Sequence, residues 1–429
     1  MRAQAVGRDT TVGTFRAAGY PEVDFHDFHR RELPRRLADG GNERIAWDVA
    51  GSAPFALTVD GASYSYVAEP AAVRIVAGVV ADAEVVIGLD RESWQDYVYE
   101  FRTRFGLLYS RAVEFVRGDF DGWDRWEPAI RAMYSGRAIY DPGSLDLRDL
   151  EGRPLDLHRS FTTDDRPEDL SHFLQATGYL VVRQAFGPDR IAEIGAEVDR
   201  LRDQAREGEF DSWWAADGEG RRFPYRLTFM GERSATLEAL NADPTVQRLT
   251  ALGGQQVVPV SDRVEGLLAV LKDFGTDPEV TGFANLPWHK DCGLGGCQIT
   301  CPSVLVGVQL DAANRSSSQL TMMAGSWGKA CHDRPTEAEL ARLPVVELET
   351  EAGDATVHMG CGLHAGMAPT GPNRRRTVYV QSYNPRVFDF LGRHQGYQQI
   401  IPGYGQGTIL NVEEVQAHLD VEEVQAQVD

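Results

Sequence analysis

The sequence contains no uninterrupted run of about 18 apolar residues, the length that an α-helix needs to cross a bilayer. Its first residues, MRAQAVGRDTTVG, also lack the apolar core of a secretory signal. We therefore expect no stable membrane insertion and a cytoplasmic location.

Basic residues are few relative to acidic ones. The chain has 43 Lys and Arg against 64 Asp and Glu, which gives a net charge of -21. A surface with this charge repels nucleic acids and anionic lipids. We expect no nucleic-acid partner.

Cysteine is also scarce, with five residues that all lie in the C-terminal half. An odd number in a large chain without a signal favours free thiols. Cys292, Cys297 and Cys301 could be taken as zinc ligands, but their spacings of five and four residues are wider than those of a CxxC knuckle.

A chain of 429 residues with ordinary hydrophobic content, 42%, favours two folded domains. Residues 1–140 predict an α+β domain. In it, FALTVDGASYSYV (55–67) reads as a β-hairpin, strands follow at 84–89 and 113–117, and helices begin after Asp90 and around Trp126. Residues 141–166 are polar and aperiodic, as in a linker.

The second predicted domain covers residues 167–410. Helices are expected from Pro167 to Gly178 and from Pro188, with a strand at 179–182 between them. Further short strands are expected at 303–310, 320–323, 345–348, 355–359 and 377–382. This spacing is typical of a sandwich or barrel. Residues 411–429 form an acidic tail that repeats VEEVQA.

A candidate metal site lies in LPWHKDCGLGGC (286–297). In an extended segment His289 and Asp291 point to the same side, about 7 Å apart, and could reach one cation. Lys290 between them is expected to be solvated. The same spacing recurs at His418 and Asp420 in the tail, so this pattern alone is weak evidence.

A second segment, GDATVHMGCGLHAGMAPTGPNRRRTVYVQ (353–381), supplies His358 and His364 and an arginine cluster. Either histidine could complete a 2-His-1-carboxylate triad with His289 and Asp291, the set used by non-haem Fe(II) oxygenases. Arg375 shares the more polar strand face with Thr377, Tyr379 and Gln381. A guanidinium there could hold a carboxylate as a bidentate pair.

These residues resemble the phytanoyl-CoA dioxygenase (PhyH) branch of the Fe(II)/2-oxoglutarate oxygenases over roughly residues 165–405. The family has an HxD motif, a distal histidine after a GD-containing strand, and a 2-oxoglutarate arginine eleven residues later. Counting eleven from His364 gives Arg375, whereas counting from His358 gives Pro369. The resemblance implies His289, Asp291 and His364 as metal ligands and catalytic residues, and Arg375 as the cosubstrate residue.

The resemblance also implies a double-stranded β-helix (jelly-roll or cupin-like) catalytic domain with flanking helices. Fe(II), 2-oxoglutarate and O2 would serve to oxidise, most simply to hydroxylate, a C–H bond of a small apolar substrate from lipid or natural-product metabolism. Succinate and CO2 would be released. Two departures stand out: AGSW (324–327) replaces a PGSH-like segment, and Gly366 stands where a small hydroxyl residue is common.

Residues 1–140 resemble a sterol carrier protein 2-like lipid-binding domain through their order of strands and helices and the segment VEFVRGDFDGW. Aromatic residues could line an apolar cavity there or form plain core: Tyr64, Tyr66, Trp94, Tyr97, Phe101, Trp123 and Trp126. The alternative function is therefore a lipid-binding or carrier protein with a catalytically silent oxygenase-like scaffold.

Overall fold

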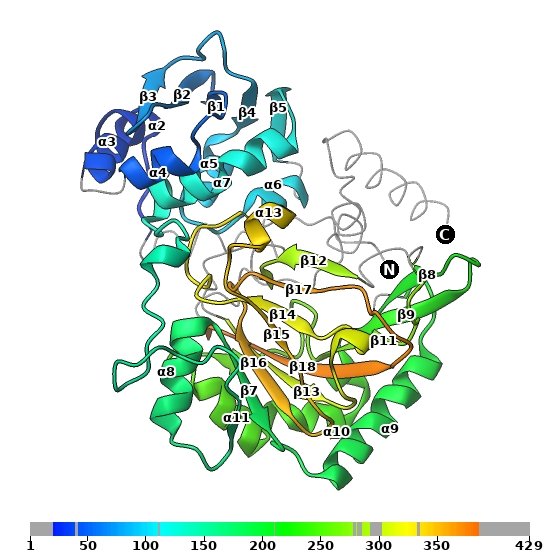
Figure 1. Cartoon of the computed structure of the whole chain (residues 1–429). Coiled ribbons are helices and arrows are strands. Elements are labelled where there is room, and N and C mark those ends of the chain that lie inside the picture. The colour runs from blue at the N-terminus through cyan, green and yellow to red at the C-terminus, as the bar shows by residue number, and fades with distance from the viewer. Residues whose placement is uncertain are drawn as a thin grey trace.

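The chain folds into an N-terminal unit and a larger C-terminal unit, which a computed structural model shows side by side (Figure 1). The structure describes residues 20–38, 42–109, 112–209, 211–277, 280, 285–291, 303–332 and 335–385. None of the helices in these ranges combines the length and hydrophobicity that crossing a membrane requires.

A five-stranded sheet in the order β3-β2-β1-β4-β5 forms the N-terminal unit. Its strands are β1 (Phe55–Val59), β2 (Ala62–Ala68), β3 (Val73–Ala77), β4 (Val85–Leu89) and β5 (Val113–Arg117). The expected hairpin is β1 and β2. Its two turn residues, Asp60 and Gly61, both have positive φ angles, 49° and 81°, which suit the twist of a two-residue hairpin turn. The edge strand β3 was not anticipated.

Short helices precede this sheet and longer ones pack on it. They are α2 (Phe25–Asp27), η1 (Phe28–Glu32), α3 (Leu33–Arg36), α4 (Asn42–Asp48), α5 (Arg91–Val98), α6 (Arg104–Tyr109) and α7 (Phe120–Ser135). Asp90 caps α5 as its sequence suggests, because its carboxylate accepts a hydrogen bond from the Ser93 amide at 2.7 Å.

The aromatic side chains of this unit form a packed core. Tyr97 and Trp123 meet edge to face at 5.6 Å, and the Trp123 indole donates to the Tyr97 hydroxyl at 3.1 Å. Trp126 donates to the Ala53 carbonyl at 3.0 Å, and Tyr66 bonds to the Tyr134 hydroxyl. Rings that contact one another and satisfy their own polar atoms are typical of a core.

The connection to the second unit is largely irregular and includes η3 (Pro142–Ser144) and β6 (Phe161–Thr162). Helix α8 (Pro167–Thr177) then ends at Gly178, whose φ of 89° is the left-handed conformation that glycine accepts readily. Strand β7 (Tyr179–Arg183) and helix α9 (Pro188–Gln204) follow, close to the expected positions.

Two sheets face each other in the C-terminal unit. The nine-stranded sheet has the order β6-β7-β16-β13-β18-β11-β9-β8, with β10 paired to β18, and the four-stranded sheet has the order β12-β17-β14-β15. The strands of the larger sheet are β8 (Ser212–Ala216), β9 (Arg222–Leu227), β10 (Val258–Pro259), β11 (Leu268–Lys272), β13 (Val304–Gln309), β16 (Ala355–Met359) and β18 (Arg375–Tyr383), besides β6 and β7. Those of the smaller are β12 (Leu286–His289), β14 (Leu320–Met323), β15 (Val345–Leu348) and β17 (His364–Gly366).

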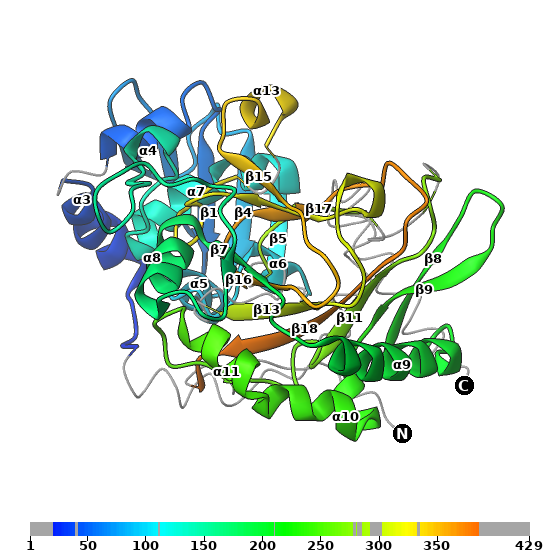
Figure 2. The ribbon, with the colours of Figure 1, turned by 60° about the horizontal axis from the view of Figure 1, so that its bottom comes forward.

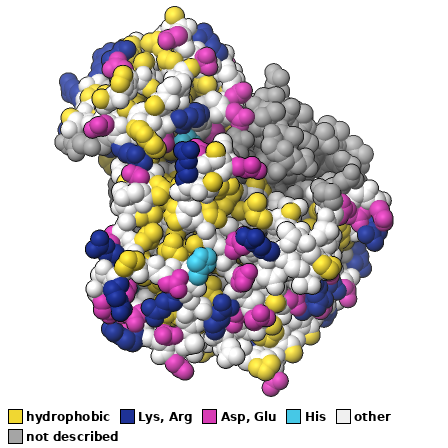
Figure 3. Space-filling view, viewed as in Figure 1, with side chains coloured by type: hydrophobic (Ala, Val, Ile, Leu, Met, Phe, Trp, Pro, Cys, Tyr) yellow, Lys and Arg dark blue, Asp and Glu magenta, His cyan; other side chains and the backbone are white. Residues whose placement is uncertain are grey.

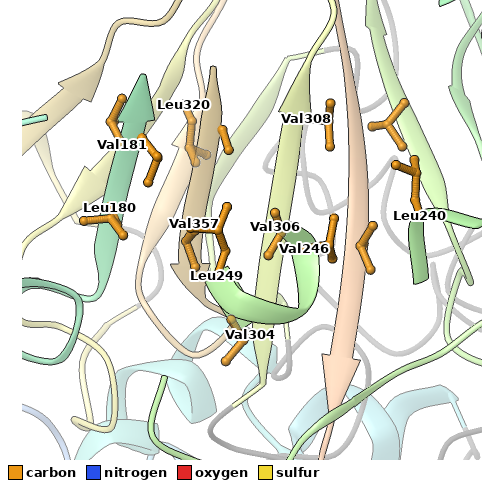
Figure 4. Close-up of a cluster of buried hydrophobic side chains, with 14 of the residues drawn as sticks. Leu180, Val181, Leu240, Val246, Leu249, Val304, Val306, Val308, Leu320 and Val357 are labelled. Atoms are coloured by element: carbon orange, nitrogen blue, oxygen red, sulfur yellow. The ribbon is translucent and has the colours of Figure 1, made fainter. Parts of the chain in front are cut away.

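Among the strands that the structure describes, the sheets do not close into a barrel, and their arrangement is consistent with the predicted double-stranded β-helix. Helices α9, α10 (Ala235–Glu238) and α11 (Pro244–Ala251) lie against the outer face of the larger sheet (Figure 2). Figure 4 shows part of the resulting core, in which side chains of α11 pack with those of three strands: Leu180, Val181, Val246, Leu249, Val304, Val306, Val308 and Val357.

The N-terminal unit is tied to the C-terminal unit by the segment after α7 and the loop after β14. Ile139 and Ala330 form a parallel bridge, and the Tyr140 hydroxyl donates to the Ala324 carbonyl at 2.9 Å. Arg125 of α7 lies 3.0 Å from the His332 Nε2 atom. On the face seen in Figure 3, hydrophobic side chains gather below the N-terminal unit, whereas charges of both signs are interspersed lower down.

The predicted tail at 411–429, with its two VEEVQA repeats and its His418 and Asp420, lies outside the described residues. So do Cys292, Cys297 and Cys301. Of the two cysteines that the structure describes, Cys331 is half-buried and Cys361 is buried.

Candidate metal and cosubstrate site

Three predicted ligand residues converge between the two sheets. His289 is the last residue of β12 and Asp291 follows two positions later, whereas His364 opens β17. Strands β12 and β17 are antiparallel, with His289 directly opposite His364. Residues opposite each other in such a pair project to the same side, so this pairing brings the distal histidine to the HxD motif.

One ligand atom from each residue lies within 4.8 Å of the other two, a spacing that suits a single metal ion. The Nδ1 atom of His289 is 2.7 Å from the Pro287 carbonyl, and that of His364 is 2.9 Å from the Gly362 carbonyl. Because a carbonyl only accepts, each Nδ1 carries the proton. Both Nε2 lone pairs therefore point at Asp291, 3.4 and 3.6 Å away. The two imidazole lone pairs and the Asp291 carboxylate face a common point, an arrangement that suits a bound cation.

The protonation states agree with this geometry. Burial, followed by the neighbouring His289, lowers the pKa of His364 to about 3, which leaves its imidazole neutral at pH 7. Burial alone would raise the pKa of Asp291, but the electrostatic interactions with the surrounding histidines, His364 first, hold it well below its usual range. The donor set is a neutral imidazole and an ionised carboxylate, as metal binding requires.

His358 lies beside this triad. It belongs to β16, and its Nε2 atom is 3.3 Å from Asp291 Oδ2. Its ring centroid lies 4.9 Å from that of His364. The structure thus places His358 against the carboxylate ligand, while the compact ligand set contains His364.

Arg375 lies on the wall of the same cavity, which measures about 60 Å³. Its side chain is 3% exposed and donates to three neutral oxygens: the Thr377 hydroxyl, the Ser318 carbonyl and the Tyr379 hydroxyl. Among the described residues no carboxylate lies within ion-pair distance of it. A buried guanidinium in this setting favours an anionic ligand.

The neighbouring arginines point away from the cavity. Arg376 pairs with Asp311 at 2.9 Å and with Asp199 at 2.8 Å on the opposite face of the sheet. Arg374 is 3.6 Å from Asp311, and its side chain is 40% exposed. The alternation along β18 therefore separates one cavity arginine from two structural ones, as the sequence pattern predicts.

Other expectations need correction. Lys290 is not solvated: it is 6% exposed, and its ammonium donates to the Cys331 carbonyl at 3.3 Å. It points away from the triad into a small cavity between the two units, lined also by Arg104, Glu127 and Arg131. Its burial comes from the N-terminal unit, which local sequence does not reveal.

Three further side chains lie near the site. Two of them have structural contacts, and the third lines the cavity. Trp288 packs in a small apolar cluster, and Gln309 bonds within the sheet to Thr356 and Thr377. Lys272, by contrast, lines the cavity. In the AGSW segment, Ser326 accepts a hydrogen bond from the Leu363 amide at 2.8 Å and so supports the residue before His364.

The C-terminal unit is similar to a known protein family. Residues 174–377 match the family described as phytanoyl-CoA dioxygenase (PhyH). The match includes His289, Asp291, His364 and Arg375 and leaves out the N-terminal unit, for which the sterol carrier protein 2-like resemblance gains no support. No curated protein matches the chain.

Several solved structures are similar in part. AviO1 from Streptomyces viridochromogenes Tue57 is 21% identical with a TM-score of 0.42 and covers 51% of this chain and 96% of its own. The non-heme alpha ketoglutarate dependent epimerase SnoN from nogalamycin biosynthesis is 20% identical with a TM-score of 0.39, covering 56% and 90%. EctD from S. alaskensis with bound Fe is 17% identical with a TM-score of 0.42, covering 55% and 83%. At these values no conclusion about substrate or reaction follows.

For residues 174–377, the triad and the PhyH match together indicate an oxidoreductase with Fe(II)- and 2-oxoglutarate-dependent oxygenase-type chemistry.

Proposed function

We propose that the protein is a non-haem Fe(II)/2-oxoglutarate-dependent dioxygenase that hydroxylates a C–H bond of a small organic substrate. The observation that carries this proposal is one cavity whose wall contains both a His-Asp-His triad and an arginine without a carboxylate partner among the described residues. This arrangement suits a dicarboxylate that chelates a metal with one end and is held at the other.

The protein's residues have separate roles. His289, Asp291 and His364 would hold the iron. Arg375 pairs with the distal carboxylate of 2-oxoglutarate, and Thr377 and Tyr379 fix the orientation of its guanidinium. When bound, the iron supplies the redox chemistry that couples decarboxylation of 2-oxoglutarate, to succinate and CO2, with insertion of one oxygen atom into the substrate.

The character of the cavity wall supports an apolar substrate. Besides the triad and the cations, aliphatic side chains from both sheets line it: Leu268, Val270, Leu286, Leu305 and Leu320. Such a wall favours hydrocarbon next to the metal and excludes water from it.

A single pair of measurements tests the assignment. Under anaerobic conditions, Fe(II) and 2-oxoglutarate together should produce the visible charge-transfer band of their chelate, and oxygen should then yield succinate. A protein that binds an apolar probe but neither binds iron nor forms succinate would instead be a carrier with a silent scaffold. Mass spectrometry of small molecules that co-purify with the protein would address the substrate.

A further inference from the structure

A second cation shares the cavity with Arg375. Lys272 is the last residue of β11, and its Cα partner across the antiparallel ladder is Arg375 itself. Directly paired residues project to the same face of a sheet. Lys272 is 4% exposed, and both side chains line the cavity that the triad residues also line.

The position of the ammonium is set by β17 on the opposite sheet. Lys272 Nζ donates to the Gly366 carbonyl at 3.3 Å, so the side chain spans the gap between the sheets. A Cβ atom at position 366 would lie 4.0 Å from this nitrogen. Glycine therefore leaves the space beside the ammonium open, two residues along β17 from His364.

The cavity wall carries more basic than acidic side chains. Among the described residues that line it, Asp291 is the one acidic side chain, and it is one of the three proposed metal ligands. Arg226, also in the lining, already pairs with Glu265. Burial, with the nearby positive charge of Arg375, holds the pKa of Lys272 well below its usual range. An anion between the two cations would relieve their repulsion.

We propose that Lys272 is a second anchor for the distal carboxylate of 2-oxoglutarate, acting beside Arg375. This inference rests on the proposed function. The guanidinium fork fixes the plane of the carboxylate, and the ammonium adds a point charge from the neighbouring strand. The site thereby selects 2-oxo acids that carry a second carboxylate.

The test uses binding without turnover. Fe(II)-loaded, oxygen-free Lys272→Met protein is titrated with 2-oxoglutarate and, separately, with 2-oxobutyrate, which keeps the chelating end and lacks the distal carboxylate. Affinity for 2-oxoglutarate should fall about tenfold or more, because a charge-assisted hydrogen bond is lost. Affinity for 2-oxobutyrate should change less than about twofold.

Controls separate the possible outcomes. Lys272→Arg should retain most 2-oxoglutarate affinity, and Arg374→Met, at an exposed position just before β18, should retain all of it. Unchanged 2-oxoglutarate affinity in Lys272→Met would overturn the inference while leaving the proposed function intact, and would point to a substrate anion instead. Equal losses for both acids would show a structural effect and also overturn it. If the wild-type protein forms no chelate, the proposed function itself fails.

Discussion

At the scale of single residues, the metal site depends on which nitrogen of each histidine is free. Backbone carbonyls hold the Nδ1 protons of His289 and His364, so Nε2 would be the ligand atom in both. His364→Ala removes one of three donors and should abolish Fe(II) binding with little change in folding. Metal analysis of the purified protein, together with its thermal unfolding curve, measures both effects.

His358 provides the matched control, since it is a buried histidine of the same cavity. His358→Ala removes the contact with Asp291 Oδ2 and leaves the three ligands in place. We expect Fe(II) to remain bound, with affinity reduced about 10- to 100-fold, as for partners of metal ligands in general. Full iron content in His364→Ala with none in His358→Ala would reverse the choice of ligand.

At Arg375 the shape of the side chain can be tested separately from its charge. Arg375→Lys keeps the positive charge but loses the planar fork, so affinity for 2-oxoglutarate should fall roughly tenfold or more. Arg374→Lys should have almost no effect. Arg376→Lys should lower the free energy of unfolding rather than the affinity, because Arg376 pairs with Asp311 and Asp199 away from the cavity. Equal affinity losses at all three positions would contradict the strand-face assignment.

At the scale of helices and strands, a buried histidine gives the N-terminal unit a pH dependence. The His29 ring stacks on Tyr64 at 4.3 Å, and its nitrogens contact the Phe25 carbonyl and the Tyr66 hydroxyl, both at 2.7 Å. Burial lowers the pKa of His29 from 6.5 to about 4. Between pH 6.5 and 4 His29 therefore binds a proton in the unfolded chain but not in the folded chain. The free energy of unfolding falls as the pH drops through this range.

The size of this effect is about 3 kcal/mol, since each pKa unit corresponds to about 1.4 kcal/mol. Chemical denaturation at several pH values should show the loss, and His29→Gln should flatten it. His26→Gln, at an exposed neighbouring position, should leave the slope unchanged. An NMR titration in which the His29 ring charges near pH 6.5 in the folded protein would refute the prediction.

Sequence pattern predicts an element when the element is long or clearly bounded. Strands β14, β15 and β16 lie where their apolar residues place them. By contrast, β17 has three residues and β12 has four, including Pro287. Strands this short cannot show a recognisable alternation of apolar and polar residues. Strands β8 and β9 were missed as well, because SWWAA and RFPYRL do not alternate regularly.

The same limit applies to the site. The HxD spacing and the alternation around Arg375 are local, and both can be recognised in the sequence. The position of Lys272 beside Arg375 depends on the pairing of β11 with β18, about one hundred residues apart, and on the open space at Gly366. Long-range pairing of this kind has no local signature.

At the scale of the whole molecule, the two units can be tested separately. We predict that a fragment from about residue 150 onward binds iron and forms succinate slowly, because all proposed site residues lie within it. We also predict that residues 1–140 fold alone, around their own sheet and aromatic core. Circular dichroism, iron analysis and succinate assays measure these properties. A folded C-terminal fragment that binds no iron would show that the N-terminal unit is needed for the metal site.

The fragment should nevertheless be less stable than the full chain. Its separation breaks the bridge between Ile139 and Ala330 and the hydrogen bond from Tyr140 to the Ala324 carbonyl. Losing a buried hydrogen bond typically costs about 1–3 kcal/mol for each unsatisfied group. Thermal unfolding of the iron-free forms, compared at one pH, measures the difference.

Lys290 lies in the sequence between two proposed iron ligands, His289 and Asp291. Its side chain points away from them into the small cavity between the two units. If iron binds as proposed, iron on one side and the N-terminal unit on the other would both restrain residues 289–291. Two binding events that order one segment are reciprocally coupled: whatever factor docking adds to iron affinity, iron must add to docking. Loss of the metal would then weaken the contact between the two units. Protease cleavage between residues 141 and 166 should therefore be faster in the metal-free protein.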